Sequence, residues 1–162
     1  MGREVLYVRD ERGEFIRAAG DEIVAAAKAH LNRRLRRGAA LTSPQLVRDF
    51  LTTKLGDRDC EFFCMMAVDA RHRLIEYVEL FRGTIDGASV HPRTVVKVAL
   101  ELGAAAVVLA HCHPSGQPTP SQADERITQR LREALSLVEI RVLDHVICAG
   151  GDTASFTELG LL

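Results

Sequence analysis

At 162 residues the chain is close to the ~150 typical of one domain, and its 47% hydrophobic and 27% charged residues exclude a disordered or collagen-like chain. A net charge of −1 does not favour nucleic acid as a partner, and no apolar run approaches the ~20 residues of a membrane helix. The four cysteines lack CxxC spacing, which excludes a zinc ribbon and favours reduced thiols in a cytoplasmic protein. With apolar runs this short, we expect no membrane association.

The first ~20 residues show little pattern, and a surface helix is then predicted between Asp21 and Gly38. Its inward positions recur every four residues: Ile23, Ala27, Leu31 and Leu35. Four arginines lie on the other face: Arg33, Arg34, Arg36 and Arg37. We interpret this face as solvated, with contact to a nucleic-acid backbone as the alternative.

A second helix is predicted from Pro44, with Ser43 as its N-cap, to Gly56 just beyond its end. Its inward residues are Leu46, Val47, Phe50 and Leu51. The pattern then changes to two apolar runs, 62–68 and 74–81, separated by a polar turn at 69–73, which indicates a β-hairpin.

The second half of the chain alternates helices and strands. A helix is predicted over 92–102 with four residues inward: Val95, Val96, Ala99 and Leu100. A buried strand over 104–110, a helix over 122–136 and a strand over 140–148 follow. This alternation predicts an α/β fold, a sandwich around a mixed β-sheet.

A proline-rich loop between the strand predicted over 104–110 and the helix predicted over 122–136 carries the metal-binding chemistry. His111 and His113 leave the strand two residues apart, so their side chains project to one side and can converge on one ion. Asp124 lies in the first turn of the next helix, where the loop can bring it beside them. Two imidazoles and one carboxylate are typical of a catalytic zinc site that keeps its fourth position for water. Cys112 should point away and is not expected to be a ligand.

Ser121 and Asp124 also have a structural interpretation. They are spaced as a capping box at the start of the helix, with Asp124 in place of the usual Glu or Gln. For Ser121 this interpretation is compatible with a catalytic role, and for Asp124 we favour the metal role.

The arrangement His111-x-His113, seven residues, Ser121, two residues, Asp124 resembles the JAMM (MPN+) metalloprotease motif. More narrowly, the chain resembles the RadC family, historically called DNA repair proteins, in the segments HPSGQPTPSQAD, FRGTIDGASVHPRTVVKVALELGAAAVVLAH and RVLDHVICAGG. The resemblance covers 41–162 and implies a short form, with a helical appendage over 1–40 instead of the helix-hairpin-helix region. Cys112 departs from the Asn usual between the two histidines.

The resemblance implies a three-layer sandwich of the JAMM/MPN, cytidine-deaminase-like class, and a zinc-dependent metallopeptidase. His111, His113 and Asp124 would be the metal ligands. Glu61 would be the general base, although on sequence alone it could be a carboxylate at the edge of a buried strand, and Ser121 would stabilise the oxyanion. The expected partner is a peptide or protein substrate.

A DNA-repair-associated accessory protein with little or no hydrolase activity is the alternative function, and the sequence predicts no oligomeric state. His145 alternates with apolar residues on a predicted strand and is interpreted as a buried or metal-supporting imidazole, not as a ligand. We expect no role for His30 or His72.

Overall fold

The computed structural model describes residues 5–83 and 90–162, except the side chain of Arg34. The chain divides into two compact units, one ending at Arg34 and the other comprising Leu35–Leu162. Within the described ranges, no helix combines the length and the hydropathy needed to cross a membrane.

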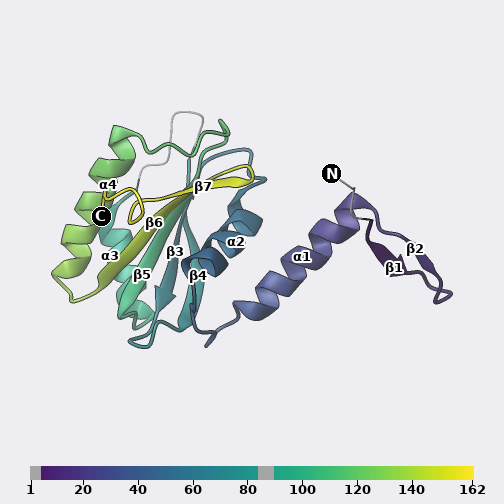
Figure 1. Cartoon of the computed structure of the whole chain (residues 1–162). Helices are drawn as coiled ribbons and strands as arrows, with labels where there is room; N and C mark the ends of the chain where they lie inside the picture. Colours follow the sequence, from purple (N-terminus) through teal and green to yellow (C-terminus); the bar gives the residue numbers. More distant parts are fainter. Residues whose placement is uncertain (1–4, 84–89) are drawn as a thin grey trace. The chain divides into compact units, whose positions relative to one another are not determined.

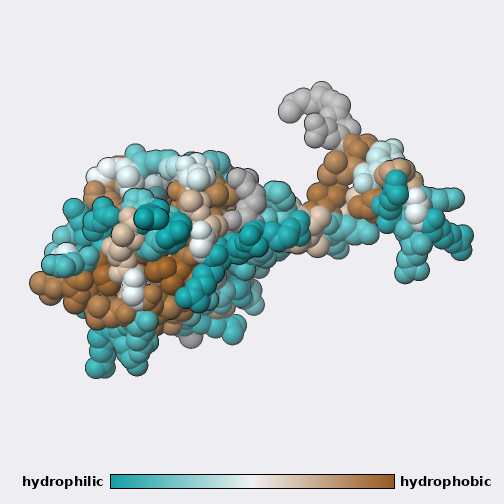
Figure 2. All heavy atoms as spheres, turned by 90° about the horizontal axis from the view of Figure 1, so that it is seen from below, coloured by the Kyte–Doolittle hydropathy of each residue, from teal (hydrophilic) through white to brown (hydrophobic). Residues whose placement is uncertain are grey.

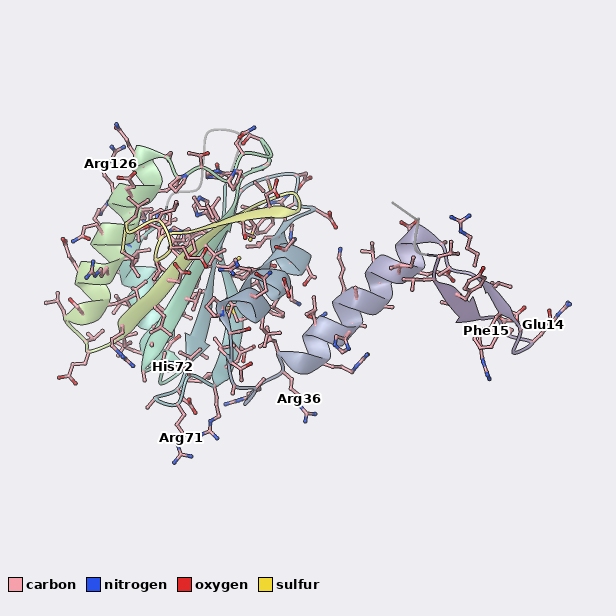
Figure 3. The ribbon with its side chains drawn as sticks, viewed as in Figure 1. Glu14, Phe15, Arg36, Arg71, His72 and Arg126 are labelled. Atoms are coloured by element: carbon pink, nitrogen blue, oxygen red, sulfur yellow. The ribbon has the colours of Figure 1, made fainter. Side chains whose placement is uncertain are left out.

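The first unit contains two short strands that the sequence did not predict. β1 (Tyr7–Arg9) pairs antiparallel with β2 (Phe15–Arg17), and α1 (Gly20–Arg34) follows. Figure 3 labels Glu14 and Phe15 beside the hairpin turn. Large hydrophobic side chains are exposed on this unit: Val5, Leu6, Tyr7, Phe15, Ile16 and Val24. Figure 2 shows brown, hydrophobic atoms on its surface.

The prediction that the first helix extends to Gly38 is wrong. The helix ends at Arg34, and the next residues pair with the sheet: Gly38 N–H donates to Leu74 O at 2.7 Å, and Leu74 N–H donates to Ala39 O at 2.8 Å. Leu35 is buried in the larger unit. The four-residue spacing that predicted one helix therefore included a residue that does not belong to the first unit. Ala27, predicted inward, is exposed, and Arg36 and Arg37 lie beyond the helix, so the four arginines do not share one helical face.

The larger unit is built on a five-stranded mixed sheet of order β4-β3-β5-β6-β7. Its strands are β3 (Phe62–Val68), β4 (Leu74–Arg82), β5 (Ala106–Cys112), β6 (Arg141–Ala149) and β7 (Asp152–Ser155). β5 and β6 are parallel and the other neighbours are antiparallel. The predicted hairpin is confirmed as β3 and β4, the strand predicted over 104–110 lies two residues later, and β7 was not predicted.

Helices cover both faces of this sheet, which confirms the three-layer α/β sandwich. α2 (Pro44–Leu55) lies on one face, and α3 (Pro92–Glu101) and α4 (Gln122–Ser136) lie on the other (Figure 1). The predicted cap of α2 is present, since the Ser43 hydroxyl accepts a hydrogen bond from Leu46 N–H at 3.2 Å. This bond satisfies one of the donors that every helix start leaves without an internal partner.

One hydrophobic core lies between the sheet and the α3–α4 layer. Its buried residues are Phe63, Met65, Ala67, Val95, Ala99, Ala104, Val107, Leu109, Leu131, Leu135 and Ile140. Leu100, predicted to point inward, is 52% exposed. Val95 and Ala99 set the buried line of α3, and Leu100 is turned by about 100° from Ala99, toward solvent.

Candidate metal centre

The end of β5 and the start of α4 bring together His111, His113 and Asp124. One potential ligand atom from each of these residues lies within 4.8 Å of the others, and we call them the histidine–aspartate cluster. His111 is the penultimate residue of β5, His113 follows that strand, and Asp124 is the third residue of α4. The convergence predicted from the spacing is therefore present in the fold.

The separations within the histidine–aspartate cluster fit a tetrahedral metal ion. The Nε2 atoms of the two histidines lie 2.9 Å apart, and His111 Nε2 lies 3.1 Å from Asp124 Oδ1. His113 Nε2 lies 3.5 Å from Asp124 Oδ2. Ligand atoms of a four-coordinate zinc ion, each about 2.0–2.1 Å from the metal, are about 3.3 Å apart. The donor set and its spacing thus suit an ion such as zinc.

A capping box holds the Asp124 carboxylate in place. Its Oδ2 atom accepts hydrogen bonds from the Ser121 backbone N–H at 2.8 Å and from the Ser121 hydroxyl at 2.6 Å, while Asp124 N–H donates to Ser121 Oγ at 3.2 Å. The predicted capping box is therefore confirmed. Because Oδ2 is occupied in this way, Oδ1 is the oxygen turned toward His111.

The proline-rich loop orients the His113 ring. His113 Nδ1 lies 2.8 Å from the backbone oxygen of Gln117, and His113 N–H donates to Cys148 O at 2.9 Å. A carbonyl oxygen can only accept, so Nδ1 carries the hydrogen and a neutral ring has its lone pair on Nε2. That is the nitrogen facing His111 and Asp124.

Two members of the cluster have shifted pKa values. Burial opposes ionisation of Asp124, but hydrogen bonds from His111 and His113 outweigh it and hold its pKa well below the usual range. The hydrogen bond with Asp124 raises the pKa of His113, against the opposing effect of burial, and the charge of Glu61 adds to the increase. These shifts favour an ionised Asp124 carboxylate next to a positive charge, and a bound metal cation would supply such a charge.

Glu61 immediately precedes β3, and this strand pairs antiparallel with β5, the strand that carries His111. Phe63 pairs with His111, so extending the antiparallel register by two residues brings Glu61 opposite His113. The effect of Glu61 on the pKa of His113 agrees with this proximity. Its backbone oxygen accepts a hydrogen bond from Gly83 N–H at 2.8 Å, which fixes the start of the strand.

Cys112 and His72, which were not expected to be ligands, lie outside the histidine–aspartate cluster. Cys112 is buried on the other side of β5, where its sulfur lies 3.3 Å from Phe62 N and 3.4 Å from Cys60 O. His72 lies in the turn between β3 and β4, and Figure 3 shows it at the opposite end of the sheet from Arg126 near the start of α4. Neither residue is near enough to join the cluster.

His145 is fully buried and contacts the cluster from behind, with its Nε2 2.8 Å from His111 Nδ1. Its other nitrogen contacts Thr128, a residue that the sequence analysis missed. Thr128 follows Asp124 by four positions and so lies on the same face of α4, which is the one signal that could have identified it.

Comparisons with known proteins match most of the chain. The family model of the RadC-like JAB domain matches residues 41–161. A UPF0758 protein of Aeromonas hydrophila is 52% identical over 140 residues, covering 86% of this chain and 62% of the relative. A UPF0758 protein of Nitrosococcus oceani is 57% identical over 135 residues, which cover 83% of this chain and 60% of the relative. One of Vibrio cholerae is 52% identical over 143 residues, which cover 88% of this chain and 90% of the relative. The chain thus spans less than two thirds of several relatives' length.

Proposed function

We propose that this chain, which belongs to the RadC-like JAB domain family, is a zinc-dependent hydrolase that cleaves a peptide or isopeptide bond. The observation that carries the proposal is the convergence of two imidazoles and one carboxylate from β5 and α4. The side chains of His113 and Asp124 are each 15% exposed, whereas that of His111 is 7% exposed. A site that solvent reaches on one side is what catalysis needs and what a purely structural site avoids.

His111, His113 and Asp124 would hold the zinc ion through Nε2, Nε2 and Oδ1. A zinc ion with three protein ligands acts as a Lewis acid that polarises a carbonyl and lowers the pKa of a coordinated water. The donor set favours zinc over magnesium or calcium, which prefer oxygen ligands. The capping box keeps Asp124 in one orientation, which lowers the entropy lost when the ion binds.

Glu61 would act as the general base. It immediately precedes β3, the strand next to the ligand strand, and extending the register of these two strands would bring it opposite His113. Its carboxylate would accept a proton from the attacking water and return that proton to the leaving amine.

Ser121 would stabilise the oxyanion that forms at the attacked carbonyl. Its hydroxyl donates to Asp124 Oδ2 in the structure and would turn toward the substrate oxygen. The Ser121 backbone N–H would continue to hold Asp124 during this turn. The start of α4 lies at the same point, and its dipole adds positive potential there.

The test is hydrolysis by the zinc-loaded protein. A panel of peptides, lysine-linked isopeptides and C-terminally extended proteins is incubated with zinc-loaded protein, chelator-treated protein and protein reloaded with zinc. The proposal expects release of a new amine that disappears with the chelator and returns with zinc. Equal rates in loaded and chelated protein, or no turnover of any member of the panel, would count against a hydrolase.

A further inference from the structure

A line of hydrogen bonds runs from His111 into the interior, away from the proposed ion. His111 Nδ1 lies 2.8 Å from His145 Nε2, and His145 Nδ1 lies 2.5 Å from Thr128 Oγ1. The Thr128 hydroxyl in turn lies 2.6 Å from the backbone oxygen of Asp124. The line therefore begins at one proposed ligand and ends at the main chain of another.

The Asp124 backbone oxygen and the burial of His145 together fix the direction of every hydrogen bond in this line. The Asp124 carbonyl cannot donate, so the single Thr128 hydroxyl hydrogen points to it. Thr128 Oγ1 must then accept from His145 Nδ1–H, because two lone pairs 2.5 Å apart would repel. His145 is fully buried, where a second ring proton and its charge would be costly, so its Nε2 is an acceptor and His111 Nδ1 donates to it.

We propose that Thr128 and His145 are positioning residues that keep the hydrogen of His111 on Nδ1, so that its Nε2 lone pair faces the metal position. This inference rests on the proposed metal site and adds two residues to it. Neither residue would touch the ion or the substrate. Both would act through the ring of His111, by selecting one of its two neutral tautomers.

The surroundings of His145 leave its ring little freedom to adopt another arrangement. Phe156 stacks on it, with 4.7 Å between ring centroids, and Phe63 meets it edge-on at 5.4 Å. Phe63 also stacks on His111 at 6.1 Å. Packing therefore fixes the ring positions, and the Thr128 hydroxyl determines where the ring hydrogens lie.

Removing the Thr128 hydroxyl should release this control. In Thr128→Val, His145 Nδ1 loses its acceptor, and the ring can instead carry its hydrogen on Nε2 and donate to His111 Nδ1. The hydrogen of His111 would then move to Nε2, the atom that must bind the ion. Loss of such an outer partner typically weakens metal binding by about 10- to 100-fold.

The first experiment reads the ring hydrogens directly, by long-range ¹H–¹⁵N correlation of histidine-labelled protein with and without zinc. We expect His145 to carry its hydrogen on Nδ1 in both samples and zinc-loaded His111 to carry its hydrogen on Nδ1. A His145 hydrogen on Nε2 in the wild type would overturn the inference. This result does not depend on zinc binding, so the metal site and the hydrogen-bond line can fail separately.

The second experiment measures zinc affinity by competition with a chromophoric chelator. Thr128→Val should bind zinc about 10- to 100-fold more weakly, and the matched Thr128→Ser, which keeps the hydroxyl, should bind nearly as the wild type. His145→Phe should lose affinity and His145→Gln, which can both donate and accept, should recover part of it. Equal affinities for Thr128→Val and Thr128→Ser would overturn the inference. A wild type that binds no zinc would instead overturn the proposed function.

Discussion

Phe63 lies directly opposite His111 in the antiparallel pair of β3 and β5, and its ring stacks on the imidazole with 10° between their planes. This contact helps to hold β3, which starts just after Glu61, in register with β5, which carries His111. Because side chains alternate between faces, a slip of one residue would turn Phe63 away from His111 and shift Glu61 from His113. Packing in the core and the geometry of the site therefore depend on the same register.

Zinc binding should require the histidine–aspartate cluster. We expect about one zinc per wild-type chain, and loss of the ion in His113→Ala and Asp124→Ala because each removes one of three ligands. Free zinc at 100 times the dissociation constant should stabilise the wild type by about 2.7 kcal/mol, measured as a rise in the unfolding midpoint. His30→Ala, at an exposed position of α1, is the matched control and should bind zinc normally. A wild type that stays metal-free in added zinc would contradict the site.

The stability of the metal-free protein should depend on pH in two opposite ways. The pKa of His113 is raised, so its contribution is present below the ordinary histidine pKa of about 6.5 and is lost as the pH rises through the folded value. The pKa of Asp124 is lowered, so its contribution is present above about 3.9 and is lost on acidification. Denaturant unfolding in chelator should therefore show greatest stability between these values. Asp124→Asn should flatten both limbs, and an unchanged profile would argue against the pair.

Two buried thiols should resist alkylation in the native protein. Burial raises the pKa of Cys64 and of Cys148 to about 12, so only about 10⁻⁴ of each is thiolate at pH 8. Cys60 is partly exposed and accepts a hydrogen bond from Arg82 Nε at 3.2 Å, so it should react first. Mass spectrometry of briefly alkylated protein measures the order, with Cys60→Ser as the control. Fast labelling of Cys148 before unfolding would contradict the packing of β6.

Much of the fold was predictable because its signals are local. Ser43, Pro44 and Gly56 mark both ends of α2, and the His111-x-His113 spacing with Asp124 identified the cluster. The short strands β1, β2 and β7 lack such signals, since each is defined by the strand that it pairs with. Thr128 was missed because its position four residues after Asp124 shows only which face of α4 it shares, whereas its role depends on the His145 ring, 17 residues away in the chain.

The arginines around the end of α1 test the alternative function in nucleic-acid binding. Arg33, Arg36 and Arg37 are exposed, and only Arg33 of these three lies in the helix. We expect their replacement by Gln to change unfolding free energy and DNA affinity little, because exposed charges contribute little to stability and the three do not form one helical face. Titration of labelled duplex DNA at two salt concentrations is the measurement. A large, salt-sensitive loss of affinity would favour the accessory DNA-binding function.

The role proposed for Glu61 separates an enzyme from a metal-stabilised scaffold. Glu61→Gln keeps the size of the side chain but removes the proton acceptor, so it should retain zinc and fold while turnover falls by about 10²- to 10⁴-fold. Zinc content, unfolding midpoint and amine release are measured on the same preparation. Glu76→Gln, at an exposed position on β4, is a control for the same chemical change and should keep full activity. Loss of zinc from Glu61→Gln would make Glu61 a ligand, and undiminished turnover would place the base elsewhere.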